Sequence, residues 1–121
     1  MKDCPFCNKE GRLFGNELAH VREDRFPVSP GHCLVIPHRH IAGYFETTRE
    51  ERLAMDRLLD ETKRHLDVLH RPDGYNVGIN IGDAAGQTIP HVHIHLIPRY
   101  RGDMPDPRGG VRGVIPARQN Y

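Results

Sequence analysis

Three histidines alternate with apolar residues in one short internal segment of the chain. The segment reads Pro-His-Val-His-Ile-His-Leu-Ile-Pro and covers residues 90–98. Because successive side chains of a β-strand point to opposite faces, this spacing predicts a strand with one imidazole face and one apolar face. Imidazole changes its charge near neutral pH, so this face predicts a functional site; a histidine-rich metal-binding strand is the alternative. The imidazole face consists of His91, His93 and His95.

A long helix is the second predicted element. Thr48-Arg-Glu-Glu51 has the spacing of a capping box, and leucines recur behind it at helical intervals as far as Leu69. We therefore expect a helix from about Thr48 to His70, ended by Pro72. A second strand is expected over 75–81, where apolar and polar residues alternate, and it would pair antiparallel with the histidine strand.

These elements predict an α+β fold, with an antiparallel sheet of about five strands and one long helix. The length of 121 residues predicts a single domain, residues 1–121. Residues 101–121 form a tail rich in proline, glycine and arginine, for which an ordered turn and a lid over the site are both open interpretations. We expect most of the remaining histidines to lie at the surface or at the end of the helix, namely among His20, His32, His38, His65 and His70. Of these, His32 is the best suited to support the triad from a neighbouring strand.

The net charge of +1 gives no overall field that would attract nucleic acid or a membrane. No apolar run approaches the roughly 20 residues of a membrane span, and the first residues lack the apolar core of a signal peptide. An odd number of cysteines, three, argues against a secreted disulfide scaffold. We therefore expect a cytoplasmic protein that binds neither nucleic acid nor membrane.

The chain resembles the histidine triad family of nucleotide hydrolases and transferases. The family motif His-φ-His-φ-His-φ-φ, with φ an apolar residue, matches residues 91–97 at every position. Residues 80–89 and 30–37 resemble two further family stretches, and Cys4-Pro-Phe-Cys7 is similar to the start of bacterial members. The resemblance covers residues 4–100, and it implies a homodimer that pairs through the long helix and a central strand.

The resemblance implies attack on the α-phosphate of a purine nucleotide, such as an adenosine phosphoramidate or a dinucleoside polyphosphate. His93 is the implied nucleophile, and a nucleotidyl-histidine intermediate divides one hard displacement into two easier ones. This role needs one free ring nitrogen, and a hydrogen bond from the other to a backbone carbonyl near His91 would fix that tautomer. His95 would donate to a non-bridging phosphate oxygen. His91 and Gln87 complete the expected catalytic set.

The substrate would be bound by residues from several segments. Gln87 and Thr88 would hold the phosphate chain, Gly86 would let the backbone approach the phosphate closely, and Asn80 would contact the ribose or a phosphate. Solvation of a loop and capping of a turn are the alternatives for these polar side chains. The ribose would be bound by Asp24, and the purine by Phe6 and Leu34, which are equally suited to an ordinary core.

Cys4 and Cys7 have the spacing of a metal site and also of a redox site. A redox pair is expected at a helix N-terminus after a strand, and no strand precedes Cys4. The resemblance supplies His40 and His91 as further ligands and thus implies a structural Cys2His2 zinc site. Such a site would keep His91 from contacting phosphate. Two free thiols are the alternative, and no cofactor is expected for the chemistry itself.

Two other functions compete with an enzyme. One is a non-catalytic nucleotide-binding module of the same fold, against which the complete triad argues. The other is a small zinc protein that binds nucleic acid, against which the low net charge and the single Cys-x-x-Cys argue.

Overall fold

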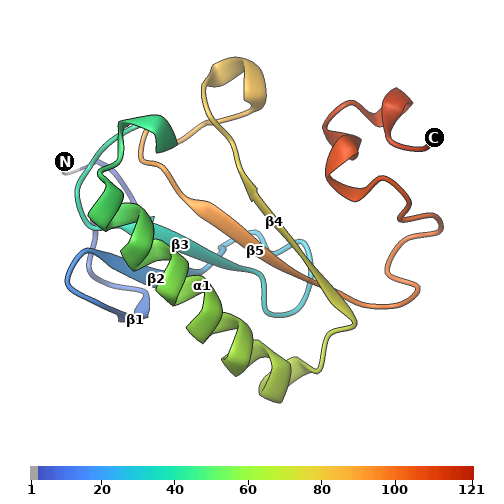
Figure 1. Ribbon diagram of the computed structural model, residues 1–121, viewed down its shortest axis with the longest axis horizontal. Helices are drawn as coiled ribbons and strands as arrows, with labels where there is room; N and C mark the ends of the chain where they lie inside the picture. The colour runs from blue at the N-terminus through green and yellow to red at the C-terminus, as the bar shows by residue number, and fades with distance from the viewer. Residues whose placement is uncertain (1–2) are drawn as a thin grey trace.

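The fold is built on one antiparallel sheet with a helix across one face (Figure 1). The computed structural model describes residues 3–121. The strand order is β1-β2-β3-β5-β4, and every neighbouring pair is antiparallel. This confirms the α+β fold and the single long helix. The strands are β1 (Arg12–Gly15), β2 (Ala19–Glu23), β3 (Cys33–Pro37), β4 (Gly74–Ile79) and β5 (Ile94–Arg99).

The predicted helix is present as α1 (Arg49–His70). Its capping box is complete: the Thr48 hydroxyl accepts from the backbone N–H of Glu51 at 3.1 Å, and the Glu51 carboxylate accepts from the N–H of Thr48 at 2.8 Å. The helix ends at Arg71, whose φ of 49° is left-handed, directly before Pro72. The cap and the proline therefore set the two ends that the sequence predicted.

The alternation of side chains gives the sheet two different faces. The face under α1 holds the main core, to which β3 contributes Cys33 and Val35. The opposite face is free of helices, and there Leu34 and Ile36 pack with Phe6 from the N-terminal segment. This second face carries the histidines. The main core consists of Ala19, Val21, Cys33, Val35, Ala54, Met55, Leu58, Leu66, Ile94 and Leu96.

The predicted pairing of the two strands is confirmed, with Gly78 opposite His95 in the register of β4 and β5. One boundary differs from the prediction, because β5 begins only at Ile94 and so leaves His91 and His93 ahead of the strand. Val92 explains the difference, since its N–H bonds to the carbonyl of Ile41 at 2.8 Å and not to a strand. The lead-in to β5 is thereby bent toward the end of β3.

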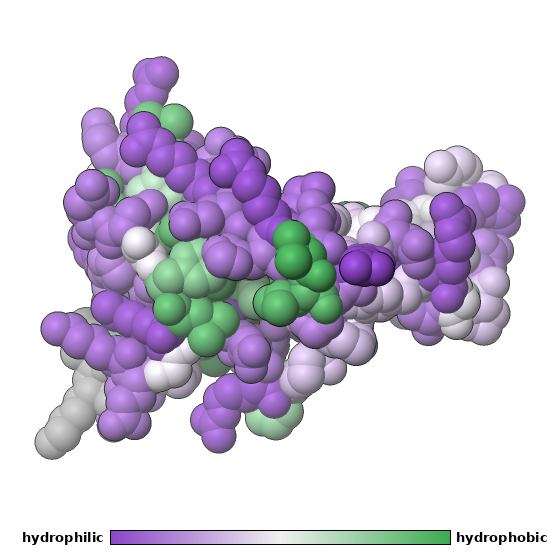
Figure 2. Space-filling model, turned by 90° about the horizontal axis from the view of Figure 1, so that it is seen from below, coloured by the Kyte–Doolittle hydropathy of each residue, from purple (hydrophilic) through white to green (hydrophobic). Residues whose placement is uncertain are grey.

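Short 3-10 helices complete the chain. They are η1 (Tyr44–Glu46), η2 (Asp83–Ala85), η3 (Gly110–Val114) and η4 (Pro116–Arg118). The last two lie in the tail, which leaves the end of β5 and projects beside the sheet (Figure 1). In the view from below, the tail forms a narrower lobe, and hydrophobic side chains gather in the middle of that face (Figure 2). Among residues 3–121, no helix is long and apolar enough to span a bilayer.

Candidate active site and metal centre

A cavity of about 1000 Å³ opens on the helix-free face of the sheet. Its walls come from the N-terminal segment, the β2–β3 connection, β4, the loop before β5 and the tail. The cavity brings together most of the predicted substrate-binding residues, but its lining within residues 3–121 includes neither His91 nor Gln87. The predicted residues that line it are Phe6, Asp24, Leu34, Asn80, Gly86, Thr88, His93 and His95.

The ring of His93 is held in one tautomer. Its Nδ1 lies 2.9 Å from the carbonyl oxygen of His91. Because a carbonyl only accepts, Nδ1 must carry the proton, and Nε2 keeps its lone pair. The ring packs edge-on against Phe6, with centroids 4.8 Å apart, and within residues 3–121 no hydrogen-bond partner engages Nε2. His93 thus has the free ring nitrogen that a nucleophile needs.

His95 is held in the opposite tautomer through His32. The N–H of Val28 donates to His32 Nδ1 at 3.0 Å, so the proton of a neutral His32 sits on Nε2. That Nε2 lies 2.9 Å from His95 Nδ1 and donates to it. His95 therefore carries its own proton on Nε2. The supporting role expected of His32 is present in the structure as this hydrogen bond.

Asp24 lies beside this pair, with Oδ2 3.4 Å from His32 Nε2 and 3.8 Å from His95 Nδ1. The three residues are close enough together to suggest a metal site. The tautomer argues against one, because a His32 that accepts from Val28 has no second lone pair to offer a metal. Burial, followed by the charges of His93 and His32, lowers the pKa of His95 to about 4. His95 is therefore a neutral hydrogen-bond donor at pH 7.

Gln87 lies in the loop before the triad but turns its side chain toward the loop backbone. Its amide oxygen accepts from the N–H of Gly82 at 2.9 Å, and its amide nitrogen donates to the carbonyls of Ala42 and Ile89 at 2.7 and 3.0 Å. Gly86 beside it has a φ of 93°, a conformation that favours glycine. Gln87 organises this loop, and its contact with phosphate stays a prediction.

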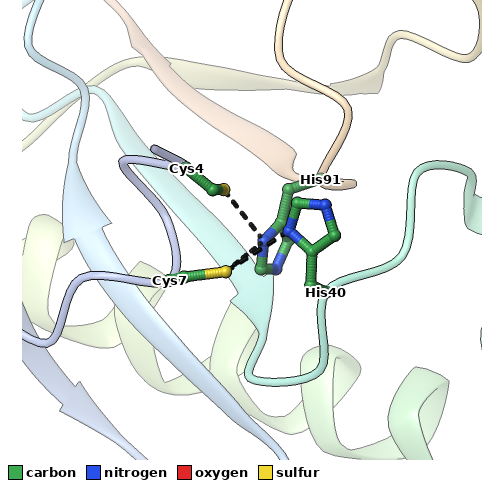
Figure 3. A group of neighbouring side chains, drawn as sticks. All are labelled: Cys4, Cys7, His40 and His91. Carbon is green, nitrogen blue, oxygen red and sulfur yellow. Dashed lines mark hydrogen bonds between the residues drawn. The ribbon is translucent and has the colours of Figure 1, made fainter. Parts of the chain in front are cut away.

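The four predicted zinc ligands form one cluster next to the candidate active site (Figure 3). The Sγ of Cys4 lies 3.4 Å from His91 Nδ1, and the Sγ of Cys7 lies 3.3 Å from His40 Nδ1 and 3.6 Å from His91 Nδ1. All four ligand atoms lie within 4.8 Å of one another. Sulfur and nitrogen ligands of a tetrahedral zinc ion are about 3.5 Å apart, so this donor set fits the metal.

His91 presents the correct nitrogen to this cluster. Its Nε2 donates to the carbonyl of Pro37 at 2.7 Å, which leaves the lone pair of Nδ1 directed at the thiols. Burial lowers the pKa of the His91 ring and so favours its neutral, ligating form. Burial also raises the pKa of the Cys7 thiol, so zinc binding would displace a proton there. His91 joins the two sites, because its ring faces the cysteines while its carbonyl holds His93.

His20 departs from the surface position expected for most histidines outside the triad. His20 is not at the surface but is 1 % exposed, and it contacts both His38 and the neighbouring Arg22. Its burial lowers its pKa to about 3. The signal that was missed is the spacing of His20 and Arg22 two residues apart in a strand, which places both on the helix-free face.

The fold and the paired histidine sites define a protein of the histidine triad class. The family model for the HIT domain matches residues 8–102. The chain therefore belongs to the HIT family, as its resemblance predicted.

Relatives and solved structures agree with this family. A HIT-like protein of Mycoplasma pneumoniae is 36% identical over 81% of this chain and 72% of its own length. An AP-4-A phosphorylase of Mycobacterium tuberculosis is 34% identical over 72% of this chain, which spans 45% of that enzyme. A zinc-bound histidine triad protein of Mycobacterium smegmatis superposes with a TM-score of 0.75 at 34% identity, covering 84% of this chain and 78% of its own.

Proposed function

We propose that this chain is a nucleotide hydrolase or nucleotidyl transferase that attacks the α-phosphate of a purine nucleotide. The observation that carries the proposal is the hydrogen bond from His93 Nδ1 to the carbonyl of His91 at 2.9 Å. It leaves Nε2 of His93 unprotonated in a residue that lines the cavity. A neutral imidazole nitrogen with a fixed tautomer is an effective nucleophile.

The reaction takes place in two displacements. In the first, Nε2 of His93 bonds to the α-phosphorus while the bond from phosphorus to the leaving group breaks, and the leaving group departs with a proton from solvent. In the second, water attacks the same phosphorus, the N–P bond breaks, and the nucleoside monophosphate leaves. Inorganic phosphate in place of water would give a nucleoside diphosphate. Each step exchanges one bond to phosphorus for another.

Negative charge on the phosphate must be held through both displacements. His95 supports this by directing its Nε2–H into the cavity, where it donates to a non-bridging phosphate oxygen. Asp24 keeps lone pairs for ribose hydroxyls, because each carboxylate oxygen accepts more than one hydrogen bond. Phe6 and Leu34 offer the purine an apolar wall, and Asn80, Gly86 and Thr88 line the part of the cavity assigned to phosphate and ribose.

A dinucleoside polyphosphate is the preferred substrate class. A cavity of about 1000 Å³ is at the upper end of the range for small-molecule sites, which suits a ligand larger than one nucleotide. The relative named AP-4-A phosphorylase supports the same class. An adenosine phosphoramidate presents the same α-phosphate to His93 and is the alternative substrate.

The Cys4, Cys7, His40 and His91 cluster is assigned to a structural zinc ion. Such an ion ties the N-terminal segment to the active-site lead-in and takes no part in the displacement. Free thiols in this cluster fit a reducing compartment such as the cytoplasm.

A homodimer is supported by apolar side chains that α1 leaves exposed, which are Leu53, Val68 and Leu69. No nucleic acid or membrane is proposed as a partner.

The experiment compares wild type with His93→Ala on diadenosine tetraphosphate and on an adenosine phosphoramidate, and it measures AMP affinity by calorimetry. We expect the variant to lose turnover while its AMP affinity stays within a few fold. His70→Ala, an exposed histidine at the end of α1, is the control. A fully active His93→Ala would refute the nucleophile. Wild type that binds AMP but turns over neither compound would identify a binding module.

A further inference from the structure

Arg22 in β2 is a buried cation, and among residues 3–121 no carboxylate forms an ion pair with it. The side chain is 8 % exposed. In place of a carboxylate, the guanidinium faces backbone carbonyls of the N-terminal segment, whose oxygens stabilise its charge. These carbonyls belong to Pro5 at 2.9 Å, Phe6 at 3.4 Å, Asn8 at 2.7 Å and Glu10 at 3.5 Å.

The segment that surrounds Arg22 is the one that carries two of the metal ligands. Cys4 and Cys7 are joined by a tight turn in which the N–H of Cys7 bonds to the carbonyl of Cys4 at 3.2 Å. The carbonyls just beyond Cys4 and Cys7 turn inward to the guanidinium, while the thiols face His40 and His91 (Figure 3). The loop of Cys4 and Cys7 thus packs around the guanidinium of Arg22.

A chain of hydrogen bonds runs from Arg22 through His20 and His38 to Asn16. Arg22 can only donate, so His20 Nε2 accepts from it at 3.0 Å and the proton of His20 sits on Nδ1. That Nδ1–H donates to His38 Nδ1 at 3.1 Å, and His38 Nε2–H donates to the carbonyl of Asn16 at 2.9 Å. The side chain of Asn16 donates in turn to the carbonyl of Ala54 in α1 at 3.0 Å. Each ring nitrogen in the chain therefore has a defined role.

This chain of hydrogen bonds reaches two of the three segments that supply the proposed metal ligands. Arg22 holds the loop of Cys4 and Cys7, and His38 lies two residues before His40 in the sequence. We propose that Arg22, acting with His20, is a positioning residue that builds the metal site in advance. It holds the loop of Cys4 and Cys7 and the segment before His40 against β2 before any metal binds. The proposal stands independently of turnover at His93, because its test measures metal affinity.

The ring of Phe6 lies between Arg22 and the proposed nucleophile His93. Its ring lies 5.6 Å from the guanidinium carbon of Arg22 and 4.8 Å from the ring of His93. Displacing the loop would therefore move one wall beside His93 as well as two metal ligands. We expect loss of Arg22 mainly to weaken metal binding. A smaller change in nucleotide binding would follow from the movement of Phe6.

The test is a zinc titration in competition with a chromophoric chelator, on wild type, Arg22→Met and Arg22→Lys. Methionine has a similar length but no donor, and lysine keeps the charge but cannot reach several carbonyls at once. We expect both variants to bind zinc about 10- to 100-fold more weakly, the usual cost of removing a supporting contact around a metal site. Arg57→Met, on the exposed side of α1, is the matched control and should bind as wild type does.

Amide NMR spectra of zinc-free wild type provide a second measurement that needs no variant. We expect residues 6–10 to keep dispersed shifts and slow hydrogen exchange without metal. An Arg22→Met or Arg22→Lys protein with wild-type zinc affinity would overturn the proposal. So would zinc-free wild type in which residues 6–10 have random-coil shifts, even if Arg22→Met failed to fold.

Discussion

His32 Nε2 lies 2.9 Å from His95 Nδ1, and this hydrogen bond fixes the proton of His95 on Nε2. The direction of the bond follows from Val28, whose N–H occupies the other nitrogen of His32. His95 itself contributes nothing to this choice, since an isolated imidazole adopts either tautomer. A buried residue from outside the triad thus sets which nitrogen of His95 carries the proton, and hence the donor assigned to phosphate in the proposed mechanism.

Substituting His32 should therefore impair turnover more than nucleotide binding. We expect His32→Ala to lower kcat by about tenfold or more, because the Nε2–H of His95 is no longer fixed toward the phosphate. His32→Gln retains an N–H donor and should recover part of the loss. Steady-state kinetics on diadenosine tetraphosphate would measure both. A His32→Ala enzyme with unchanged kcat would contradict the role of this hydrogen bond.

The buried neutral histidines predict that acid destabilises the fold. The folded pKa of His95 is about 4, below the 6.5 of the unfolded chain, so the unfolded state binds more protons between these values. The contribution of His95 is present above pH 6.5 and falls as the pH decreases toward 4. At pH 5 this loss is about 2 kcal/mol.

Urea unfolding at pH 7 and pH 5 measures the effect. His95→Gln should show a smaller loss of stability than wild type over this interval, and His70→Gln, at an exposed position, should match wild type. Equal losses in wild type and His95→Gln would show that His95 does not titrate in this way.

The cap of α1 should contribute measurably to the free energy of unfolding. Thr48→Ala removes the hydroxyl that accepts from the N–H of Glu51 at 3.1 Å and should lower that free energy by about 1 kcal/mol. Thr48→Ser keeps the hydroxyl and is the matched control. Chemical denaturation would compare the two, and equal stability of both variants would mean that the cap is not formed in solution.

The proposed metal site predicts which cysteines are needed for zinc binding. Cys7→Ala should remove stoichiometric zinc from the purified protein and lower its thermal midpoint, because one ligand of the closed site is lost. Cys33→Ala is the control: this thiol is buried in the main core, and its burial raises its pKa to about 11. Metal analysis would measure both variants. Zinc retained in Cys7→Ala would contradict the assigned ligands.

The sequence predicted those features that depend on local spacing. Alternation predicted the sheet faces around the triad, and the capping box predicted the start of α1 at Thr48. The start of β5 was not predicted, because it depends on a long-range hydrogen bond from Val92 to Ile41. The side-chain orientation of Gln87 was missed for the same reason, since its partner Ala42 lies 45 residues away in the chain.

The spacing of His20 and Arg22 places both on one face of a strand, but their burial and their link to His38 could not be derived from the sequence. Polar residues in a strand ordinarily face solvent, and their burial becomes visible only when the N-terminal segment is seen to cover them. The cluster of four proposed metal ligands, by contrast, was predicted through family resemblance, since spacing alone identified only Cys4 and Cys7. The tautomer of His93 was predicted from a carbonyl near His91, two residues away. The tautomer of His95 required the structure, because it depends on His32, which is distant in the sequence.

Nucleotidyl transfer to His93 is tested by mass spectrometry of protein mixed with diadenosine tetraphosphate, quenched rapidly without acid and then digested. We expect an adduct of one AMP on the peptide that contains the triad, mapped to His93 and absent from His93→Ala. An adduct on another residue, or turnover without any adduct at early times, would contradict nucleotidyl transfer to His93.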